Sequence, residues 1–317
     1  MAMLPEAIVL FGASGFVGRN IVEALRGRVG RLIGVNTSGR PVPGCDLTIV
    51  ADRLADIRAL PADTAIVHVA AFRYYASRFA QQQPEILSAN VGLTDAVYRF
   101  ALARNIAEVR VAGSSAVYPA EWAVLDDSQP IDLNAWPHPG EDAYAWSKRW
   151  GEIAADLWHR RAGVNTIGLR LTNPYGPFDT LDEAEAHVAS VFAIRALSDV
   201  PAFEVRGDPE AERDFVFAGD IAMAFVESLK LRGVHAVANC AAGQTTQIVE
   251  LARAAMRAAG KERPIRTNPP PPGANAGVKI RRATAAKLRE LMPGLPAFRS
   301  LDEGMRLTIE WYRDALR

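Results

Sequence analysis

Short apolar runs alternate with longer amphipathic segments along the first two-thirds of the chain. Most of the runs are apolar at consecutive positions, which is typical of strands buried on both faces of a sheet. They predict strands over Ala7–Phe11, Arg31–Val35, Leu47–Ala51, Ala65–Val69, Glu108–Gly113 and Asn165–Arg170. The segments between them predict helices over Gly15–Leu25, Arg53–Leu60, Asn90–Arg104 and Tyr144–Arg161. This alternation indicates an α/β fold with a doubly wound, Rossmann-like parallel sheet.

The pattern changes after Arg170. Pro and Gly residues predict a loop over 171–180, a helical stretch follows over 183–197, and residues 212–225 predict a strand that turns into a helix. Residues 268–277 are too rich in Pro and Gly for regular structure, and Ser300 with Glu303 forms a capping box for a C-terminal helix. We expect one domain over 1–170, rejoined by the chain at about 214–240. Residues 171–213 and 241–317 then form a smaller α/β lobe.

Three glycines follow the first predicted strand at regular intervals, Gly12, Gly15 and Gly18. A strand, a glycine turn and a helix in this order can bind a dinucleotide. Gly12 would allow the sharp exit from the strand, Gly15 would let backbone approach a diphosphate, and Gly18 would let the helix pack closely. The alternative is a tight turn with no ligand.

Two further motifs carry proton-transfer chemistry. Tyr144 and Lys148 are four residues apart, so they share one face of a predicted helix. A nearby ammonium favours the phenolate and lowers the pKa of a tyrosine from its usual value of about 10, which makes it a usable acid or base. Ser114 and Ser115 end a predicted strand, where a hydroxyl could bind the reacting oxygen. The alternatives are a solvated helix face and a serine that caps a turn.

Composition excludes several classes of partner. Lys and Arg residues equal Asp and Glu residues at 36 each, so no basic surface for nucleic acid is indicated. No apolar run is long enough to span a bilayer and no leader-like segment precedes the first strand, so we expect a cytoplasmic protein with no membrane partner. Cys45 and Cys240 are isolated, and His138 and His159 have no companion ligands in sequence, so we expect no disulfide framework and no metal site.

In this order, the motifs resemble the extended (atypical) short-chain dehydrogenase/reductase superfamily, in particular the NAD-dependent epimerase/dehydratase family. The resemblance covers nearly the whole chain. Besides the three motifs above, it rests on Asp52 after the third strand and on the segments HVAA (68–71), NVGLT (90–94), RLTNPYGP (170–177), RDFVFAGDIA (213–222) and LDEGMRLTIEWYR (301–313).

The resemblance implies a role for each matching residue. Tyr144 would be the acid/base, Lys148 its partner that also holds the nicotinamide ribose, and Ser114 the catalytic hydroxyl, with Ser115 as the near alternative. The implied cofactor-binding residues are Gly12, Ser14, Gly15, Phe16, Val17, Gly18, Asn36, Ser38, Arg40, Asp52, Arg53, Val69, Ala70, Ala71, Asn90, Tyr144, Lys148 and Leu171. The implied substrate-binding residues are Phe72, Ser115, Asn173, Arg213 and Arg282.

The chain departs from the family pattern at the cofactor end. Asn36 stands where NAD enzymes of this fold carry an acidic residue for the ribose diol, and Ser38 and Arg40 follow it. A neutral residue removes repulsion against a 2′-phosphate, and Arg40 or Arg19 could pair with that phosphate. We therefore favour NADP over NAD. The alternative is that Asn36 binds a ribose and Arg40 is only solvated.

Further departures concern the substrate. Ala116 and Val117 replace the acidic pair that dehydratases use for elimination, so 4,6-dehydratase activity is disfavoured. No Arg lies between Pro269 and Lys279, where sugar-nucleotide enzymes often carry an Arg-x-x-Asp signature; Arg281 and Arg282 follow and could replace it or be ordinary surface residues. Pro119 replaces a common Gly.

These residues predict an NAD(P)-dependent epimerase or ketoreductase that acts on a nucleotide-activated sugar by hydride transfer. One alternative is a dehydrogenase or reductase of a smaller hydroxy or keto compound, which the missing arginine signature favours. Another is a cofactor-binding sensor without turnover, which the complete Ser, Tyr and Lys set argues against. We also expect a homodimer through the predicted helices over Asn90–Arg104 and Tyr144–Arg161.

Overall fold

A parallel sheet of seven strands forms the larger part of the computed structural model, which describes residues 3–72, 81–268 and 278–317. The strand order is β12-β7-β5-β4-β1-β2-β3, and every neighbouring pair is parallel. The strands are β1 (Ala7–Phe11), β2 (Arg31–Asn36), β3 (Leu47–Val50), β4 (Thr64–His68), β5 (Glu108–Ser114), β7 (Asn165–Leu171) and β12 (Ala236–Cys240). The chain order reverses between β1 and β4, and ligands of open α/β sheets bind at such a point.

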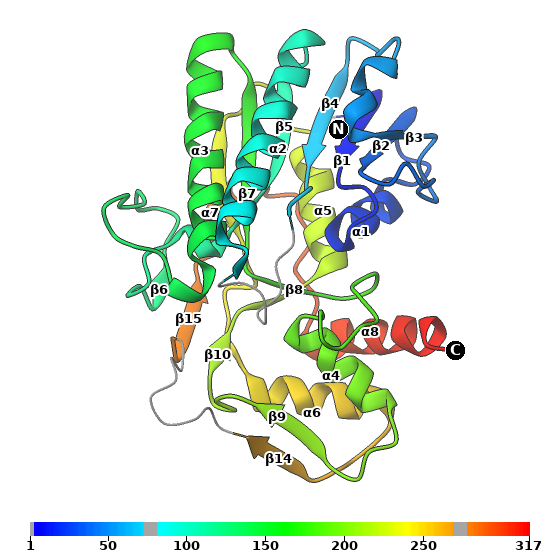
Figure 1. Cartoon of the computed structure of the whole chain (residues 1–317), viewed down its shortest axis with the longest axis vertical. Coiled ribbons are helices and arrows are strands. Elements are labelled where there is room, and N and C mark those ends of the chain that lie inside the picture. The colour runs from blue at the N-terminus through cyan, green and yellow to red at the C-terminus, as the bar shows by residue number, and fades with distance from the viewer. Residues whose placement is uncertain (1–2, 73–80, 269–277) are drawn as a thin grey trace.

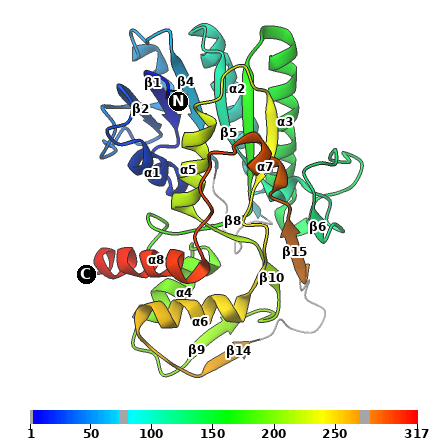
Figure 2. The same cartoon turned by 180° about the vertical axis from the view of Figure 1, so that it is seen from behind.

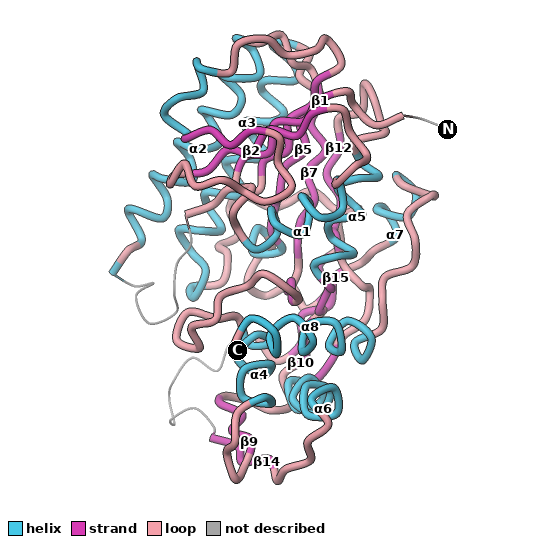
Figure 3. The backbone as a smooth tube through the Cα atoms, turned by 90° about the vertical axis from the view of Figure 1, so that its right-hand side faces the viewer, coloured by secondary structure: helices cyan, strands magenta, loops and turns pink. Residues whose placement is uncertain are grey.

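Helices cover both faces of this sheet, as Figure 3 shows edge-on. On one face lie α2 (Gln83–Ala103) and α3 (Asp142–Ala162), and on the other lie α1 (Phe16–Leu25), α5 (Ala218–Ser228) and α7 (Ala286–Leu291). The strands are buried because both faces are covered: Ile8 and Leu10 pack toward α1 and α5, while Val9 and Phe11 pack toward α2. The predicted doubly wound α/β fold is confirmed.

A smaller lobe lies beyond the carboxyl ends of the sheet strands (Figure 1). Its helices are α4 (Val188–Leu197), α6 (Ile248–Ala259) and α8 (Leu301–Ala315), which bury Phe192, Leu251 and Ile309 in a common core. Its short strands are β8 (Asn173–Tyr175), β9 (Phe203–Arg206), β10 (Glu212–Arg213), β13 (Thr246–Gln247), β14 (Ile265–Asn268) and β15 (Ile280–Ala283). Two more short strands, β6 (Val124–Leu125) and β11 (Phe215–Phe217), come from segments next to the main sheet. We propose the domain bounds given above, since α5 and β12 return to the main sheet.

Three predicted helices differ from the structure. Residues Ala51–Asp56 form a short 3-10 turn instead of a helix over Arg53–Leu60. Ile57 has extended backbone (φ -68°, ψ 98°) and ends the turn, and Pro61 disfavours helical backbone at Leu60. The helix expected over 183–197 begins only at Val188, since the Asp182 side chain accepts from the Ala184 amide and holds a turn there. Helix α2 begins at Gln83, seven residues earlier than predicted.

The expected C-terminal helix is present as α8. The Ser300 hydroxyl accepts a hydrogen bond from the Glu303 amide at 3.3 Å, so the predicted cap is confirmed. The Pro- and Gly-rich segment lies outside the described residues, except for Asn268 at the end of β14. Among the described residues, no helix combines the length and the apolarity needed to cross a membrane.

Candidate active site

The glycine turn between β1 and α1 is sterically closed to side chains at two of its three glycines. Gly12 has φ +88°, and a Cβ there would lie 2.6 Å from the backbone nitrogen of Ala70. A Cβ on Gly18 would lie 2.0 Å from the carbonyl oxygen of Gly12. Gly15 is the N-cap of α1, which has no side-chain cap, so its first amides remain available to an anion. This cradle fits the diphosphate of a dinucleotide.

The loop after β4 is fixed beside this turn. The Val69 amide donates to the carbonyl of Phe11 at 2.9 Å, and the Phe72 amide donates to the Asn90 side chain at 2.8 Å. The amide group of Asn90 in turn donates to the carbonyl of Ile86. Asn90 therefore ties the 69–72 loop to α2. Around the turn, Ser14 and Ala71 are exposed, Phe16, Val17, Val69 and Ala70 are half-buried, and Leu171 is buried at the end of β7.

The residues predicted to bind the adenosine end follow β2 and β3. The Asn36 side chain accepts from the Gly39 amide at 2.7 Å and donates to the Arg40 carbonyl at 3.0 Å, so it shapes its own loop. Ser38 and Arg40 are exposed at the tip of this loop, and Asp52 is exposed after β3. The exposed Arg53 pairs with Asp56. The structure thus brings Arg40 to the carboxyl edge of the sheet without a carboxylate at position 36.

The proposed catalytic side chains lie together at the carboxyl end of β5. The hydroxyl of Ser114 hydrogen-bonds the phenol of Tyr144 and accepts from the Ala116 amide at 3.1 Å. Lys148 Nζ donates to the carbonyl of Ala112 at 2.9 Å and lies 5.5 Å from the ring centre of Tyr144. Ser115 is half-buried and begins the 3-10 turn Ser115–Val117. Strand β5 and one face of α3 therefore assemble a Ser, a Tyr and a Lys.

Burial sets the charge states of this group. It raises the pKa of Tyr144 to about 12, despite the hydrogen bond from Ser114 that lowers it, and the carboxylate of Glu141 raises it further. Burial also lowers the pKa of Lys148 to about 8. In the chain without its cofactor, the loss of hydration thus outweighs the hydrogen bond from Ser114.

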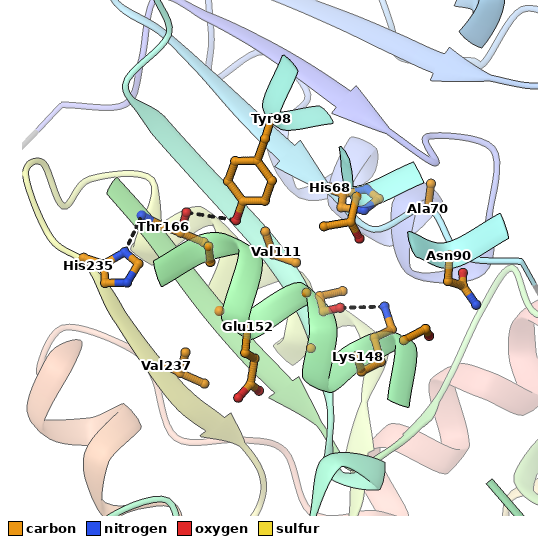
Figure 4. Close-up of a pocket in the computed structure, with 17 residues that line it drawn as sticks. His68, Ala70, Asn90, Tyr98, Val111, Lys148, Glu152, Thr166, His235 and Val237 are labelled. Carbon is orange, nitrogen blue, oxygen red and sulfur yellow. Dashed lines mark hydrogen bonds between the residues drawn. The ribbon is translucent and has the colours of Figure 1, made fainter. Parts of the chain in front are cut away.

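Beside Lys148, a cavity of about 40 Å³ is lined by residues of α2, α3 and the sheet (Figure 4). It extends past the bonded hydroxyls of Tyr98 and Thr166 to His235, whose Nδ1 accepts from the Thr166 amide. Burial and the Lys148 charge lower the pKa of His68 to about 3, so this histidine is neutral. Small residues such as Gly151 create the space. Single positions in a sequence give no signal for such a gap.

Two arginines lie side by side on the facing lobe. Arg213 on β10 and Arg281 on β15 are register partners of parallel strands. Only 11% of the Arg281 side chain is exposed, and its Nε and Nη2 atoms are buried with no hydrogen-bond partner in the described part of the chain. Its Nη1 pairs with Glu141 at 3.2 Å. Arg282 is exposed on the other face of the strand.

The remaining predicted substrate residues are Phe72, which is half-buried beside Asn90, and Asn173, whose amide group donates to the carbonyl of Asp214 at 2.9 Å. Sequence reasoning singled out neither Glu141 nor the pairing of Arg213 with Arg281. The spacing of these residues carries no signal, because β10 and β15 meet only through the tertiary fold.

A buried ion pair fixes α3 to the sheet. Arg170 at the end of β7 makes two hydrogen bonds of 2.8 Å to Glu152, one turn after Lys148. Arg170 also donates to the hydroxyl of Tyr118, which donates to Asn239 on β12. This network holds the helix that carries Tyr144 and Lys148 against three neighbouring segments. In the described ranges, no cluster of three or more His, Cys, Asp or Glu side chains is placed to hold a metal ion.

Comparisons with known proteins show what the chain is similar to. The chain is 26% identical to a dTDP-4-dehydro-6-deoxy-D-allose reductase of Streptomyces bikiniensis, over 98% of each chain. Its fold is similar to a UDP-glucose 4-epimerase of Thermotoga maritima solved with UDP-glucose (TM-score 0.81, 22% identity, 98% and 100% coverage). It is also similar to MoeE5 solved with UDP-glucose and NAD (TM-score 0.81, 25% identity, 98% and 100% coverage). Residues 8–247 match the model of the NAD dependent epimerase/dehydratase family, so the chain belongs to this family of enzymes.

Proposed function

We propose that this enzyme is an NAD(P)-dependent epimerase or ketoreductase of a nucleotide-activated sugar. The observation that carries the substrate class is the guanidinium pair of Arg213 and Arg281, which faces the catalytic helix from the smaller lobe. Two buried guanidinium nitrogens of Arg281 have no partner in the part of the chain that the structure describes, and such groups are costly unless an anion binds them. A diphosphate, with its several oxygens, suits two adjacent arginines. The names of the relatives above support the same substrate class.

The chain's own residues divide the chemistry among them. Tyr144 would give a proton to the substrate oxygen when a ketone is reduced, or take it when an alcohol is oxidised. Ser114, already bonded to the Tyr144 phenol, would hold that oxygen in line. Lys148, charged below its pKa of about 8, would orient the ribose of the cofactor and stabilise the phenolate. Ser115 is the alternative hydroxyl.

The cofactor site fits a nicotinamide dinucleotide, which supplies or accepts the hydride when bound. Gly12, Gly15 and Gly18 with the first amides of α1 would hold its diphosphate. Asp52 would contact the adenine, the 69–71 loop would line the adenosine side, and Lys148 would reach the far ribose. No step of the chemistry falls to Asn90, which positions the loop.

Binding of nucleoside diphosphates tests the substrate class. We expect UDP, GDP, dTDP or CDP to raise the melting temperature of the enzyme, because a ligand that binds only the folded state stabilises it. Arg281→Met should abolish the shift, whereas the matched control Arg282→Met, one residue away on the exposed face, should keep it. No shift with any nucleotide would favour a smaller hydroxy or keto substrate, and loss of the shift in Arg282→Met alone would return the role to Arg282.

We propose NADP as the preferred cofactor. Arg40 is the better candidate for a 2′-phosphate, since Arg19 already lies against the ring of Phe178 and pairs with Glu23. Arg40→Gln should weaken NADPH binding about tenfold and leave NADH binding within twofold. Arg28→Gln, at the opposite end of β2, is the control. Tighter binding of NADH than NADPH by the unmodified enzyme would overturn this preference.

We also propose that the enzyme is a homodimer through α2 and α3, which lie side by side on the outer face (Figure 1). Trp150, Ile153 and Leu157 are 40%, 37% and 48% exposed along α3. Contiguous exposed apolar side chains of this kind mark protein interfaces. Leu157→Glu should convert a dimer to a monomer in light scattering, and a monomeric unmodified enzyme would refute the proposal.

A further inference from the structure

One ion pair crosses from the start of the catalytic helix to the smaller lobe. Glu141 ends the 3-10 turn Pro139–Glu141 before α3, three residues before Tyr144. Its Oε2 lies 3.2 Å from Arg281 Nη1 on β15. The Glu141 side chain is 36% exposed, whereas the Arg281 side chain is 11% exposed. The carboxylate therefore has a route to water that the guanidinium does not have.

A second arginine lies beside this pair. Arg213 is the neighbour of Arg281 in the β10–β15 ladder, and its guanidinium donates to the backbone carbonyls of Glu212 and Lys279. Burial and the charge of Arg281 lower the pKa of Arg213, whereas the carboxylates of Glu141 and Asp208 raise it. Glu141 forms its ion pair with Arg281. The site thus presents two neighbouring guanidinium groups, one of which is held by Glu141.

We propose that Glu141 is a built-in competitor of the substrate, which pairs with Arg281 in the ligand-free enzyme and yields it to the substrate diphosphate. This inference rests on the function proposed above. Two features support it. Arg281 has two further nitrogens that are buried and have no partner among the described residues, so it gains by taking an anion with more oxygens. Glu141, whose side chain is 36% exposed, can rehydrate when displaced.

In this exchange Glu141 contacts Arg281 and not the reacting atoms of the substrate. It acts through Arg281, so it is a positioning residue.

Isothermal titration of inorganic diphosphate and UDP against unmodified enzyme and Glu141→Gln tests the proposal. Removing the competitor should lower the Kd of both probes about tenfold, which is 1.4 kcal/mol. The matched control is Glu210→Gln, which removes a carboxylate that pairs with Lys279 two residues before Arg281, with side chains 67% and 65% exposed. Its Kd values should stay within twofold of those of the unmodified enzyme.

A purely structural pair predicts the opposite result. If Glu141 only ties the lobes together, Glu141→Gln should bind both probes equally or more weakly, and this would overturn the proposal. Glu141→Asp keeps the charge but shortens the reach to Arg281, so it should also bind more tightly than the unmodified enzyme and serves if Glu141→Gln does not fold. In an Arg281→Met background the effect of Glu141→Gln should vanish; a persistent gain would refute exchange at Arg281.

The two proposals fail separately. If Glu141→Gln binds diphosphate more tightly but no nucleotide binds better than inorganic diphosphate, the competitor role of Glu141 is supported and the nucleotide-sugar function is refuted. Preferred binding of a nucleotide with no effect of Glu141→Gln would do the reverse. Binding of neither probe to any of the proteins would overturn both.

Discussion

Substitution of Gly18 by Ala tests how closely the glycine turn is packed. The added Cβ would lie 2.0 Å from the carbonyl oxygen of Gly12, whereas ordinary contact begins at 3.4 Å. Helix α1 must therefore shift by about 1.4 Å at this point, and forced overpacking of this kind costs about 1–3 kcal/mol. Alanine in a helix regains about 1 kcal/mol, so we expect a net loss of about 0–2 kcal/mol.

A matched substitution isolates the steric effect from helix propensity. Gly151 also lies in a helix, but a Cβ there would meet only the hydroxyl of Thr94 at 3.9 Å. Gly151→Ala should therefore gain about 1 kcal/mol, since alanine favours helix and the space is free. Urea denaturation measures the free energies of unfolding of both variants. A fluorescence titration measures the affinity of each variant for NADPH.

Gly18→Ala should also weaken NADPH binding at least tenfold, because the amides of α1 move away from the diphosphate, whereas Gly151→Ala should bind NADPH within twofold of the unmodified enzyme. Equal stability and equal affinity of the two variants would refute the close packing of α1 on the turn.

Three further predictions concern the catalytic helix. Tyr144→Phe should reduce turnover about 10²–10⁴-fold while NADPH binding in a fluorescence titration is retained, and undiminished turnover would exclude proton transfer by Tyr144. Between about pH 8 and 10.5 the unfolded chain holds a proton on Lys148 that the folded chain lacks, so the unmodified enzyme should gain stability with rising pH in this window. Lys148→Met should lack that gain and should be about 1–3 kcal/mol more stable than the unmodified enzyme at pH 7, as measured by urea denaturation. Parallel curves of stability against pH for the two proteins would contradict this. Glu152→Gln leaves Arg170 buried without its carboxylate and should cost about 3 kcal/mol by urea denaturation, whereas an unchanged midpoint would show that the pair contributes little.

The sequence predicted the main sheet because its signals are local. Buried strands such as Ala7–Phe11 read as apolar runs, and the glycine spacing after them is set by contacts within the same turn. The capping box at Ser300 is equally local. Strand β12 was harder to predict, since its place beside β7 depends on a return of the chain after more than 60 residues.

The proposed catalytic set was predictable for the same reason, and the proposed substrate side was not. Tyr144 and Lys148 lie four residues apart on one helix, so their spacing shows that they share a face. Arg213, Arg281 and Glu141 come from three distant segments that meet only in the folded enzyme. The sequence pointed to Arg282, but alternation along β15 exposes that side chain and directs Arg281 toward Glu141. Distant pairings of this kind leave no periodic pattern.

The central claim is that the carboxyl edge of the sheet binds a nicotinamide dinucleotide between the glycine turn and Lys148. Titration of the enzyme with NADPH and NADH, followed by energy transfer from tryptophan to the reduced nicotinamide, tests it most directly. We predict saturable binding of at least one of them in the micromolar range, tighter for NADPH and lost in a Gly12→Val variant, whose side chain would collide with Ala70. Absence of saturable binding for both dinucleotides, or unchanged binding in Gly12→Val, would contradict the claim.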